Sequence, residues 1–391
     1  MLLQKYLDRY VGIPLCYGLA AVDSFWHLFH HDDDAVPVRR ILLIKLWGVG
    51  NVVMILPLVE AVRRRFPDAE LHFLTLRANA DLLAGRDDLA AVHTLPERPW
   101  FRSLGALLAI WLRLRKRFDV VLDFEQFART STILSYALGI PQRVGLDTPG
   151  QGRGLLYNAR IPYRNDRHMV ETFADVVRAV GVRIENPAPS LSADSAGRGE
   201  ADALVAELGE RRPRVLIHLG SGDNFPGRRW PGSRFAELAD RLAMERGAQI
   251  VFTGTERERA LIASCRDQMS SPSFDAVGRL SLRGLVGLLE QTDLLVSNDT
   301  GPVHLASGVR CPVVALYGPN TPVLYGPRGG PHRTIYENLP CSPCLTNFNS
   351  KTSTCRLPEC MRSIETPQVF AACTDLLDEQ EGRGRRLRVL P

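Results

Sequence analysis

The residues with the clearest chemical potential lie in the second half of the chain, in the stretch 297–306, which follows a short apolar run. An apolar strand, a polar turn and a helix start in this order aim backbone N–H groups at an anion. Pro302 suits the first helical position and Thr300 or Gly301 the cap, so Asp299 and His304 would lie beside the positive end of the helix dipole. The pattern predicts a phosphate-binding turn. The alternative is that Asp299 only caps the helix and His304 belongs to the core.

A second turn of this kind lies upstream. The apolar run 214–219 leads into a glycine-rich turn that begins at Gly220 and Ser221 and ends with the pair Arg228 and Arg229. Glycine lets the backbone approach a ligand closely, and guanidinium groups supply fixed positive charge for phosphate oxygens. We expect the two turns to face one ligand.

With both turns in view, the chain resembles glycosyltransferase family 9, a family of inverting enzymes whose best known members are the ADP-heptose:lipopolysaccharide heptosyltransferases. The resemblance extends from about Arg40 to Asp378. It rests on an ordered set of motifs: Ile41-Leu42-Leu43-Ile44-Lys45, Gly48-Val49-Gly50-Asn51, Arg229-Trp230-Pro231 and Asn298-Asp299-Thr300-Gly301-Pro302-Val303-His304. It implies an α/β protein with the GT-B fold, in which two Rossmann-like domains face an interdomain cleft. The acceptor would lie mainly on the first domain and the nucleotide sugar on the second.

The resemblance also implies an enzyme that takes a sugar from a nucleotide-diphosphate donor. ADP-heptose is the leading donor, and a lipopolysaccharide core or another cell-surface glycan precursor is the acceptor. The implied donor-binding residues are Gly220, Ser221, Arg228, Arg229, Glu256, Asp299, Thr300, Gly301 and His304. Guanidinium groups and a helix dipole can stabilise a departing diphosphate without a cation. We therefore expect no required metal or other cofactor, the nucleotide sugar being the donor substrate.

Glu256 follows the predicted strand 250–253, where the family holds the ribose or base of the nucleoside, and Glu258 is the second choice for that role. The alternative is that both residues only occupy the first turn of a surface helix, where acidic side chains are favoured.

The acceptor side departs from the family pattern at Asn51, where members usually carry the Asp that heptosyltransferases are thought to use as the base. An amide can orient an acceptor but has no useful proton affinity near neutral pH. Asp123 and Glu125, at the end of an apolar strand, are the available catalytic substitutes, and their alternative role is to cap the following helix. Gly50 and Asn51 are expected to contact the acceptor together with His168, whose alternative role is structural.

Asn51 also motivates a hypothesis of a different class, a catalytically weak nucleotide-sugar-binding protein in a glycan assembly complex. A third hypothesis is an epimerase on the same scaffold, which would convert a nucleotide sugar with no acceptor present. Turnover of nucleotide sugars by the purified protein separates the three.

Four of the eight cysteines, Cys341, Cys344, Cys355 and Cys360, have the spacing of one tetrahedral structural zinc site. The loop between them is polar, and other family members also carry cysteines just after their last Gly-Pro turn. We favour reduced thiols in a structural loop over zinc, and both over disulfides, because nothing in the sequence exports the chain.

The elements that must position these residues follow an alternating pattern. At 391 residues the chain exceeds the usual size of a single core, and apolar β-branched runs alternate with helical patterns, as in parallel sheets covered on both faces. We expect an N-terminal interfacial segment, 1–38, a Rossmann-like acceptor domain, 39–185, a linker, 186–212, a Rossmann-like nucleotide-sugar domain, 213–365, and a C-terminal helix with a basic tail, 366–391. The expected strands are 41–46, 71–76, 91–95, 120–124, 143–146, 215–219, 250–253, 294–297 and 313–317. As in the GT-B fold, the final helix is expected to cross back to the first domain.

Residues 1–38 contain an apolar run that is too short to span a membrane and lacks the features of a secretory signal. Its flanking aromatic residues suit a helix lying at a bilayer interface, and the alternative is a helix packed on the protein's own surface. Basic clusters at 63–65, 113–117 and 383–388 could meet anionic lipid or a phosphorylated glycan, or be solvated helix faces.

The net charge of +5 is modest, and we expect no nucleic-acid partner. We expect a cytoplasmic protein, peripheral at the inner face of the inner membrane. Its expected partners are the nucleotide-sugar donor, a glycolipid or glycan acceptor, and a membrane surface contacted by residues 1–38 and the basic tail.

Overall fold

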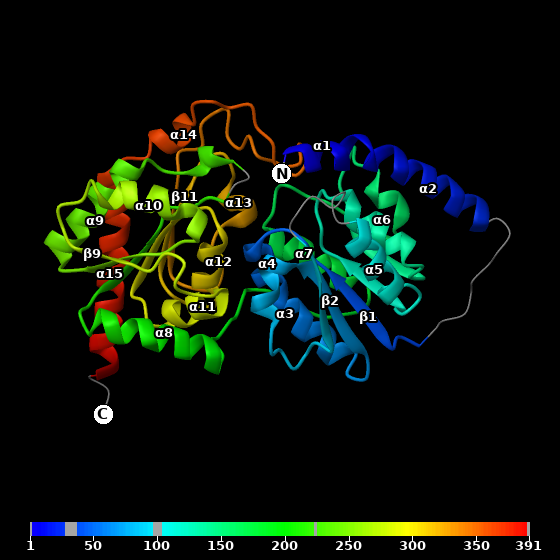
Figure 1. Ribbon diagram of the computed structural model, residues 1–391, viewed down its shortest axis with the longest axis horizontal. Helices are drawn as coiled ribbons and strands as arrows, with labels where there is room; N and C mark the ends of the chain where they lie inside the picture. The colour runs from blue at the N-terminus through cyan, green and yellow to red at the C-terminus, as the bar shows by residue number, and fades with distance from the viewer. Residues whose placement is uncertain (1, 28–36, 97–103, 223–224, 389–391) are drawn as a thin grey trace. The chain divides into compact units, whose positions relative to one another are not determined.

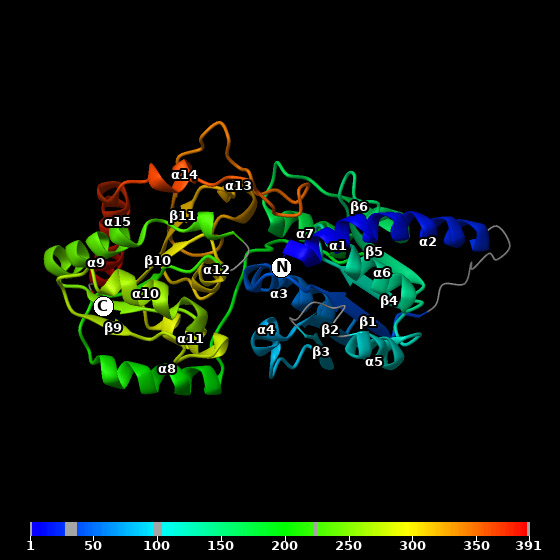
Figure 2. The ribbon, with the colours of Figure 1, turned by 45° about the horizontal axis from the view of Figure 1, so that its top comes forward.

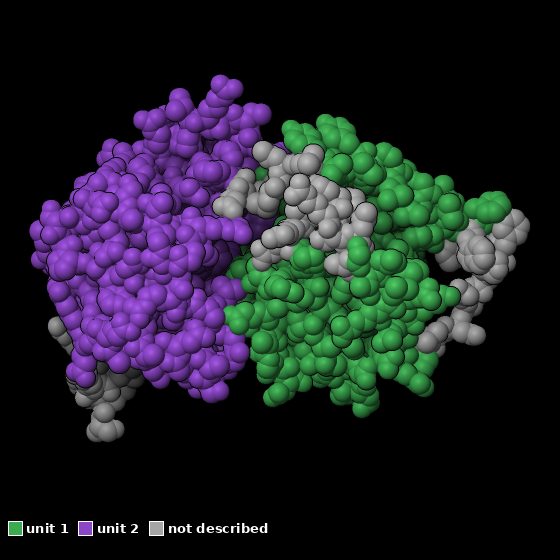
Figure 3. All heavy atoms as spheres, viewed as in Figure 1, with its two compact units in different colours: residues 1–187, 346–351 green, residues 188–345, 352–391 purple. Residues whose placement is uncertain are grey.

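The computed structural model describes residues 2–27, 37–96, 104–222 and 225–388 (Figure 1). The chain forms two compact units: unit 1 comprises Met1–Pro187 with Thr346–Lys351, and unit 2 comprises Ala188–Leu345 with Thr352–Pro391 (Figure 3). The division falls at the start of the expected linker 186–212, and much of that segment forms a helix of unit 2. Residues 28–36 of the expected N-terminal segment and 389–391 of the expected tail lie outside the described residues.

Unit 1 is built on a six-stranded sheet in the order β3-β2-β1-β4-β5-β6, and every neighbouring pair is parallel. This is the doubly wound order: β2 and β3 are added on one side of β1, and β4, β5 and β6 on the other, so the strand order reverses between β1 and β4. The strands are β1 Arg40–Ile44, β2 Glu70–Leu76, β3 Ala91–Leu95, β4 Val120–Asp123, β5 Gln142–Asp147 and β6 Ala159–Pro162.

The helices of unit 1 cover both faces of this sheet, because its central strands are apolar on both sides (Figures 1 and 2). Leu114 of α5, Leu134 of α6 and Leu138, the residue that follows α6, share one core cluster with strand residues. Helices α3 and α7 pack against each other. The helical elements are α1 Leu2–Tyr10, α2 Gly12–His27, α3 Val49–Arg65, α4 Arg77–Ala80, η1 Asp81–Leu83, α5 Leu104–Leu114, α6 Arg129–Ala137, η3 Arg153–Leu156 and α7 Met169–Arg178.

The N-terminal helices α1 and α2 pack on unit 1. This is the arrangement that the sequence analysis gave as the alternative to a helix at a bilayer interface. Asp8 caps α6, since its Oδ1 accepts the N–H groups of Arg129 and Thr130 at 2.9 and 3.0 Å while its Oδ2 accepts from the Arg129 guanidinium at 2.9 Å. Cys16 is fully buried on the inner side of α2. Among the helices of the described residues, none is long and apolar enough to cross a membrane.

Unit 2 repeats the same strand order, β12-β11-β10-β7-β8-β9, again fully parallel. Its strand order reverses between β7 and β10. The strands are β7 Arg214–His218, β8 Gln249–Phe252, β9 Ser273–Asp275, β10 Leu294–Asn298, β11 Val313–Tyr317 and β12 His332–Tyr336. The helical elements are α8 Ser195–Leu208, η4 Pro226–Arg228, α9 Gly232–Arg246, η5 Glu256–Glu258, α10 Arg259–Arg266, α11 Leu282–Glu290, α12 Gly301–Gly308, α13 Pro322–Tyr325, α14 Glu359–Arg362 and α15 Thr366–Arg388.

The final helix corrects one expectation. Instead of crossing to the first domain, α15 packs in unit 2, where Val369, Cys373 and Leu376 join the core formed by β7, β8 and β10. The apolar side chains of α15 pack against the sheet of unit 2. The segment that belongs to unit 1 is the short loop Thr346–Lys351, in which the Asn347 carbonyl accepts from Gln151 at 2.8 Å.

Candidate functional site

The two turns predicted to hold an anion lie side by side in unit 2. β7 and β10 are hydrogen-bonded neighbours, and His218 pairs with Ser297 near their carboxyl ends. Asn298 joins the turns directly, because its Oδ1 accepts the Trp230 N–H at 3.0 Å and its Nδ2 donates to the Leu219 carbonyl at 2.8 Å. Open α/β sheets bind ligands at this reversal of strand order. The geometry therefore brings both turns to the same ligand-binding edge.

Arg228 contacts both turns. Its guanidinium donates to the carbonyl oxygens of Ser221 and Asp299, the latter at 3.1 Å, and lies 3.6 Å from the Asp299 carboxylate. The side chain is 17% exposed, and its Nε has no hydrogen-bond partner in the described part of the chain. Arg229 donates from Nε to Ser221 Oγ at 3.2 Å. The Arg228 guanidinium thus links the two turns, and Arg229 adds a second positive charge beside them.

The predicted helix start is α12, which begins at Gly301. Thr300 precedes it in an extended conformation, and its hydroxyl donates back to the Asn298 carbonyl at 3.2 Å. Among the described residues, no Thr300 side-chain bond caps the first turn. Asn320 donates to the Asp299 carboxylate at 2.8 Å and fixes it beside the turn. Pro302 carries no N–H and the Val303 N–H donates to the Thr300 carbonyl at 3.2 Å, so Gly301 supplies the leading N–H at the positive end of α12.

His304 lies in the first turn of α12 and is buried. Burial lowers its pKa to about 4, and the nearby Asp299 carboxylate opposes this shift. The ring is therefore neutral at physiological pH and adds no positive charge to the turn.

The structure distinguishes the two glutamates considered for the nucleoside. Glu256 is exposed and pairs with Arg259 at 2.6 Å, an arrangement of a surface helix. Glu258 is buried beside the first turn, and a Cβ added to Gly220 would collide with its carboxylate. Its Oε2 also accepts the N–H and the hydroxyl of Thr255, each at 2.9 Å. Of the two glutamates, Glu258 is therefore the one that lies beside the turn at Gly220.

At the equivalent point of unit 1, Glu125 holds the first loop. Its Oε1 accepts the N–H groups of Leu46 and Trp47 at 2.6 and 2.9 Å, and its Oε2 lies 3.0 Å from Lys45 Nζ. Lys45 and Glu125 are fully buried, and Lys45 also donates to Gln126 Oε1 at 2.9 Å. Burial lowers the pKa of Lys45, and the Glu125 carboxylate opposes that shift.

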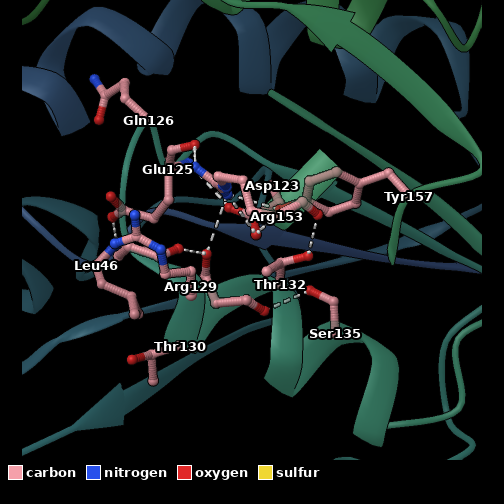
Figure 4. A network of polar contacts seen from close by, with 12 residues as sticks. Leu46, Asp123, Glu125, Gln126, Arg129, Thr130, Thr132, Ser135, Arg153 and Tyr157 are labelled. Atoms are coloured by element: carbon pink, nitrogen blue, oxygen red, sulfur yellow. Dashed lines mark hydrogen bonds and ion pairs between the residues drawn. The ribbon is translucent and has the colours of Figure 1, made fainter. Parts of the chain in front are cut away.

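Asp123 belongs to an adjoining buried network (Figure 4). It accepts from Tyr157 Oη at 2.6 Å and the Glu125 N–H at 2.9 Å, and it lies 3.4 Å from the Arg153 guanidinium. Arg153 also donates to the Glu125 carbonyl. Burial raises the pKa of Asp123, with Arg153 acting in the opposite direction.

These contacts change the role that the geometry supports for the two carboxylates. Asp123 and Glu125 have no exposed surface, and donors from the protein surround their oxygens, so in this conformation neither faces an acceptor hydroxyl. Each carboxylate forms a buried ion pair, Glu125 with Lys45 and Asp123 with Arg153. The sequence analysis assigned neither Lys45 nor Arg153 to the site. A charged residue directly after the apolar strand β1 was the signal for Lys45, whereas nothing local marked Arg153.

Asn51 and Gly50 lie in the first turn of α3, and Asn51 is partly exposed. The Asn51 amide donates to the Trp47 carbonyl at 3.3 Å. Gly48 precedes the helix with φ of +89°, a conformation that favours glycine, and a Cβ there would lie 3.0 Å from Asn51 Nδ2. Glu125 and Asn51 thus fix the same loop from opposite ends.

His168 has a local structural role. It is the N-cap of α7, buried, and its Nδ1 accepts the Val170 N–H at 3.2 Å. An accepting Nδ1 requires the neutral ring with its proton on Nε2. Contact between His168 and an acceptor stays a prediction.

None of the four clustered cysteines forms a disulfide within the described residues. Within the described residues, no group of three or more His, Cys, Asp or Glu side chains is arranged to hold a metal ion. Cys355 donates to the Leu357 carbonyl at 3.2 Å, and Cys344 accepts from Ser353 Oγ at 3.2 Å. The geometry gives no support for zinc.

Comparison with known proteins identifies the family of this chain. The glycosyltransferase family 9 (heptosyltransferase) profile matches residues 107–354. Lipopolysaccharide heptosyltransferase 1 of Pseudomonas aeruginosa is 26% identical over 322 residues, which cover 78% of this chain and 86% of the relative.

Two solved structures share the fold. The glycosyltransferase family 9 protein of Veillonella parvula superposes with a TM-score of 0.72 at 21% identity, covering 87% of this chain and 97% of its own. The ADP-heptose LPS heptosyltransferase II of E. coli gives a TM-score of 0.68 at 22% identity, covering 88% and 99%. Two doubly wound units in one chain are the GT-B architecture. On the family match and this fold together, the chain belongs to glycosyltransferase family 9, the heptosyltransferase family.

Proposed function

We propose that the protein is an inverting glycosyltransferase that moves heptose from ADP-heptose to a lipopolysaccharide core acceptor. The names of its relatives support the donor and acceptor classes, since they are a lipopolysaccharide heptosyltransferase and an ADP-heptose LPS heptosyltransferase. The observation that carries the proposal is the bridge that Asn298 makes between the two turns of unit 2, with Arg228 in contact with both.

The proposed leaving group is ADP. An acceptor hydroxyl attacks the anomeric carbon, a new C–O bond forms, and the bond to the diphosphate oxygen breaks with its electron pair on ADP. Arg228, Arg229 and the first amides of α12 stabilise this developing charge, which makes a metal ion unnecessary. Glu258, at the Gly220 turn, is the better placed of the two glutamates to accept from the ribose hydroxyls.

The acceptor side works without a carboxylate base in this proposal. Asn51 orients the hydroxyl by hydrogen bonding, and Glu125 fixes the loop that carries Asn51. The hydroxyl proton passes to solvent or to the departing diphosphate. Asp123 and Glu125 then contribute through the shape of the loop.

The test of the proposed reaction is an assay with purified protein, ADP-heptose and a lipopolysaccharide core acceptor that lacks heptose. We expect ADP release coupled to a product heavier by one heptose, with inverted anomeric configuration by NMR and an unchanged rate in EDTA. Saturable ADP-heptose binding without turnover would favour the binding protein instead. Conversion of the donor in the absence of acceptor would favour an epimerase.

Asn51→Asp tests the acceptor side. A carboxylate at this position supplies the general base that the wild-type loop lacks, and general bases contribute about 10²–10⁴-fold. We expect kcat for transfer to rise at least about ten-fold. Two results together would identify Asp123 as the general base: Asn51→Asp lowers kcat, and Asp123→Asn abolishes transfer while the protein stays folded.

We also propose that the reaction takes place at the cytoplasmic face of a membrane, with contact through α1, α2 and the basic tail. Helix α2 exposes four large apolar side chains, Leu15, Tyr17, Val22 and Phe25. Deleting residues 1–38 would also remove the Asp8 cap of α6. The sharper test is Leu15→Ser with Phe25→Ser, which should lower the membrane-bound fraction of the protein in cells; unchanged fractionation would refute the contact.

A further inference from the structure

A surface of unit 1 away from the candidate site exposes an apolar helical stripe. Helix α5 has no charged residue before Arg113. Its outer side exposes 55% of Leu108 and 52% of Leu112, which lie one turn apart. The inner side packs into the core with residues spaced for one helix face: Leu107, Ile110, Trp111 and Leu114. The exposed leucines are therefore a second apolar face, which the fold of unit 1 does not use.

Four cations follow this stripe immediately. Their side chains are all exposed: Arg113, Arg115, Lys116 and Arg117. Within the described residues none of the four forms an ion pair, and residues 104–118 contain no Asp or Glu. The next acid, Asp119, is engaged, because its carboxylate accepts the backbone N–H groups of Arg39 and Arg40 at 2.7 and 2.8 Å. We call Leu108, Leu112 and the four cations the α5 surface.

The α5 surface combines two features that a lipid bilayer satisfies together. Apolar side chains enter the boundary between headgroups and acyl chains, while cations meet the phosphates of anionic lipids. Trp111 lies at the junction, with Arg115 stacked over its ring at 4.8 Å, and Trp is enriched at this depth of membranes. A nucleic acid or an acidic peptide would pair with the cations but leave both leucines in water. We propose that the α5 surface docks unit 1 onto a membrane that contains anionic phospholipid.

The arrangement of neighbouring helices extends this surface. Trp111 Nε1 donates to the Ala137 carbonyl of α6 at 2.7 Å, and Asp8 caps the other end of α6. Helix α6 contacts α2 on one side and α5 through Trp111 and Ala137, so α2 joins α5 and α6 in one helical layer. As the crossover from β3 to β4, α5 runs antiparallel to the strands, and its first turn lies toward the carboxyl edge that carries Asn51.

The experiment is co-flotation of the full-length protein with vesicles of phosphatidylcholine alone or with phosphatidylglycerol added. We expect binding only to the anionic vesicles, weakened by salt. Arg115→Gln with Arg117→Gln should lower the partition coefficient on the order of five-fold per cation, and Leu108→Ser with Leu112→Ser should lower it at least about ten-fold. The assay contains no donor, so its outcome is independent of the proposed transfer reaction.

Matched controls carry the same chemical changes elsewhere. Arg64→Gln with Arg65→Gln removes two exposed cations of α3, and Met244→Ser with Leu357→Ser removes two exposed apolar side chains of unit 2. Both controls should bind vesicles like the wild type, and all variants should share one thermal midpoint. The proposal is overturned if the wild type does not bind anionic vesicles or if the α5 variants bind as well as the controls. It is also overturned if only Leu15→Ser with Phe25→Ser abolishes binding, because α2 alone would then carry the contact.

Discussion

The two units share one strand order but place their charged groups differently at the point where that order reverses. In unit 1, Lys45 is paired with Glu125 and Arg153 with Asp123, all of them fully buried. In unit 2, Arg228 also has a carboxylate beside it, Asp299 at 3.6 Å, but its side chain is 17% exposed. The two charges of a buried ion pair neutralise each other, whereas an exposed cation can still bind a ligand. The difference supports a structural role for the ion pairs of unit 1 and the proposed anion binding by the turns of unit 2.

The largest expected effect is on the stability of unit 1. Glu125→Ala leaves Lys45 as an unpaired buried charge and should lower the free energy of unfolding by about 3–5 kcal/mol, measured by urea denaturation. Asp166→Ala, which removes an exposed carboxylate of the same unit, should change it by less than about 0.5 kcal/mol. Replacing both partners, Lys45→Met with Glu125→Leu, should recover much of the loss. A small effect of the single variant would mean that the pair is dispensable.

Arg228→Met should show the opposite pattern, a loss of activity with little loss of stability. Removing one donor from a site of developing charge costs about 10²–10³ in rate, so kcat/KM for ADP-heptose should fall by that factor. Arg211→Met is the control, because Arg211 is exposed and donates only to the Gly247 carbonyl in the described contacts, at 2.9 Å. If Arg228→Met unfolds the protein as readily as Glu125→Ala, the contrast between the two units fails.

Acid should destabilise both units through buried histidines; besides the two below, burial also lowers the pKa of His218 in unit 2. Burial lowers the pKa of His304 in unit 2 and of His93 in unit 1 to about 4. As pH falls below the unfolded value of about 6.5, the unfolded chain binds protons at these sites while the folded chain does not, so stability falls until about pH 4. Each site should cost about 2 kcal/mol between pH 7.5 and 5. Unfolding curves of His304→Gln should show a flatter acid limb, and an unchanged slope would contradict the assignment.

The smallest expected effect concerns the N-terminal helices. Asp8→Ala removes the cap of α6 and the partner of Arg129, and should lower the free energy of unfolding by about 1–2 kcal/mol. Asp8→Asn keeps one accepting oxygen and should cost less. The comparison with wild type in urea denaturation checks whether α1 stabilises unit 1; equal midpoints would show that it does not.

The strands were predictable where they are buried. All nine predicted strands form. Eight of them are central strands, which need apolar residues on both faces of a parallel sheet and so leave a continuous apolar run; the ninth, β3, is an edge strand. The three that the sequence did not reveal, β6, β9 and β12, are all edge strands. Their short and partly polar sequences lack that run, since one side of an edge strand has no neighbour. Helix α8 was likewise hidden in the expected linker, whose composition is small, polar and rich in proline.

The amino-acid sequence by itself determined the turns of unit 2, because a helix start and a glycine-rich loop depend on local backbone chemistry that neighbouring residues encode. Only the tertiary structure decided what the carboxylates of unit 1 do. Lys45 and Arg153 reach Glu125 and Asp123 from other elements of the fold, and burial turns two candidate bases into ion-pair partners. Solvent exposure and charge pairing are properties of the packed chain, so residue type at a strand end could not reveal them.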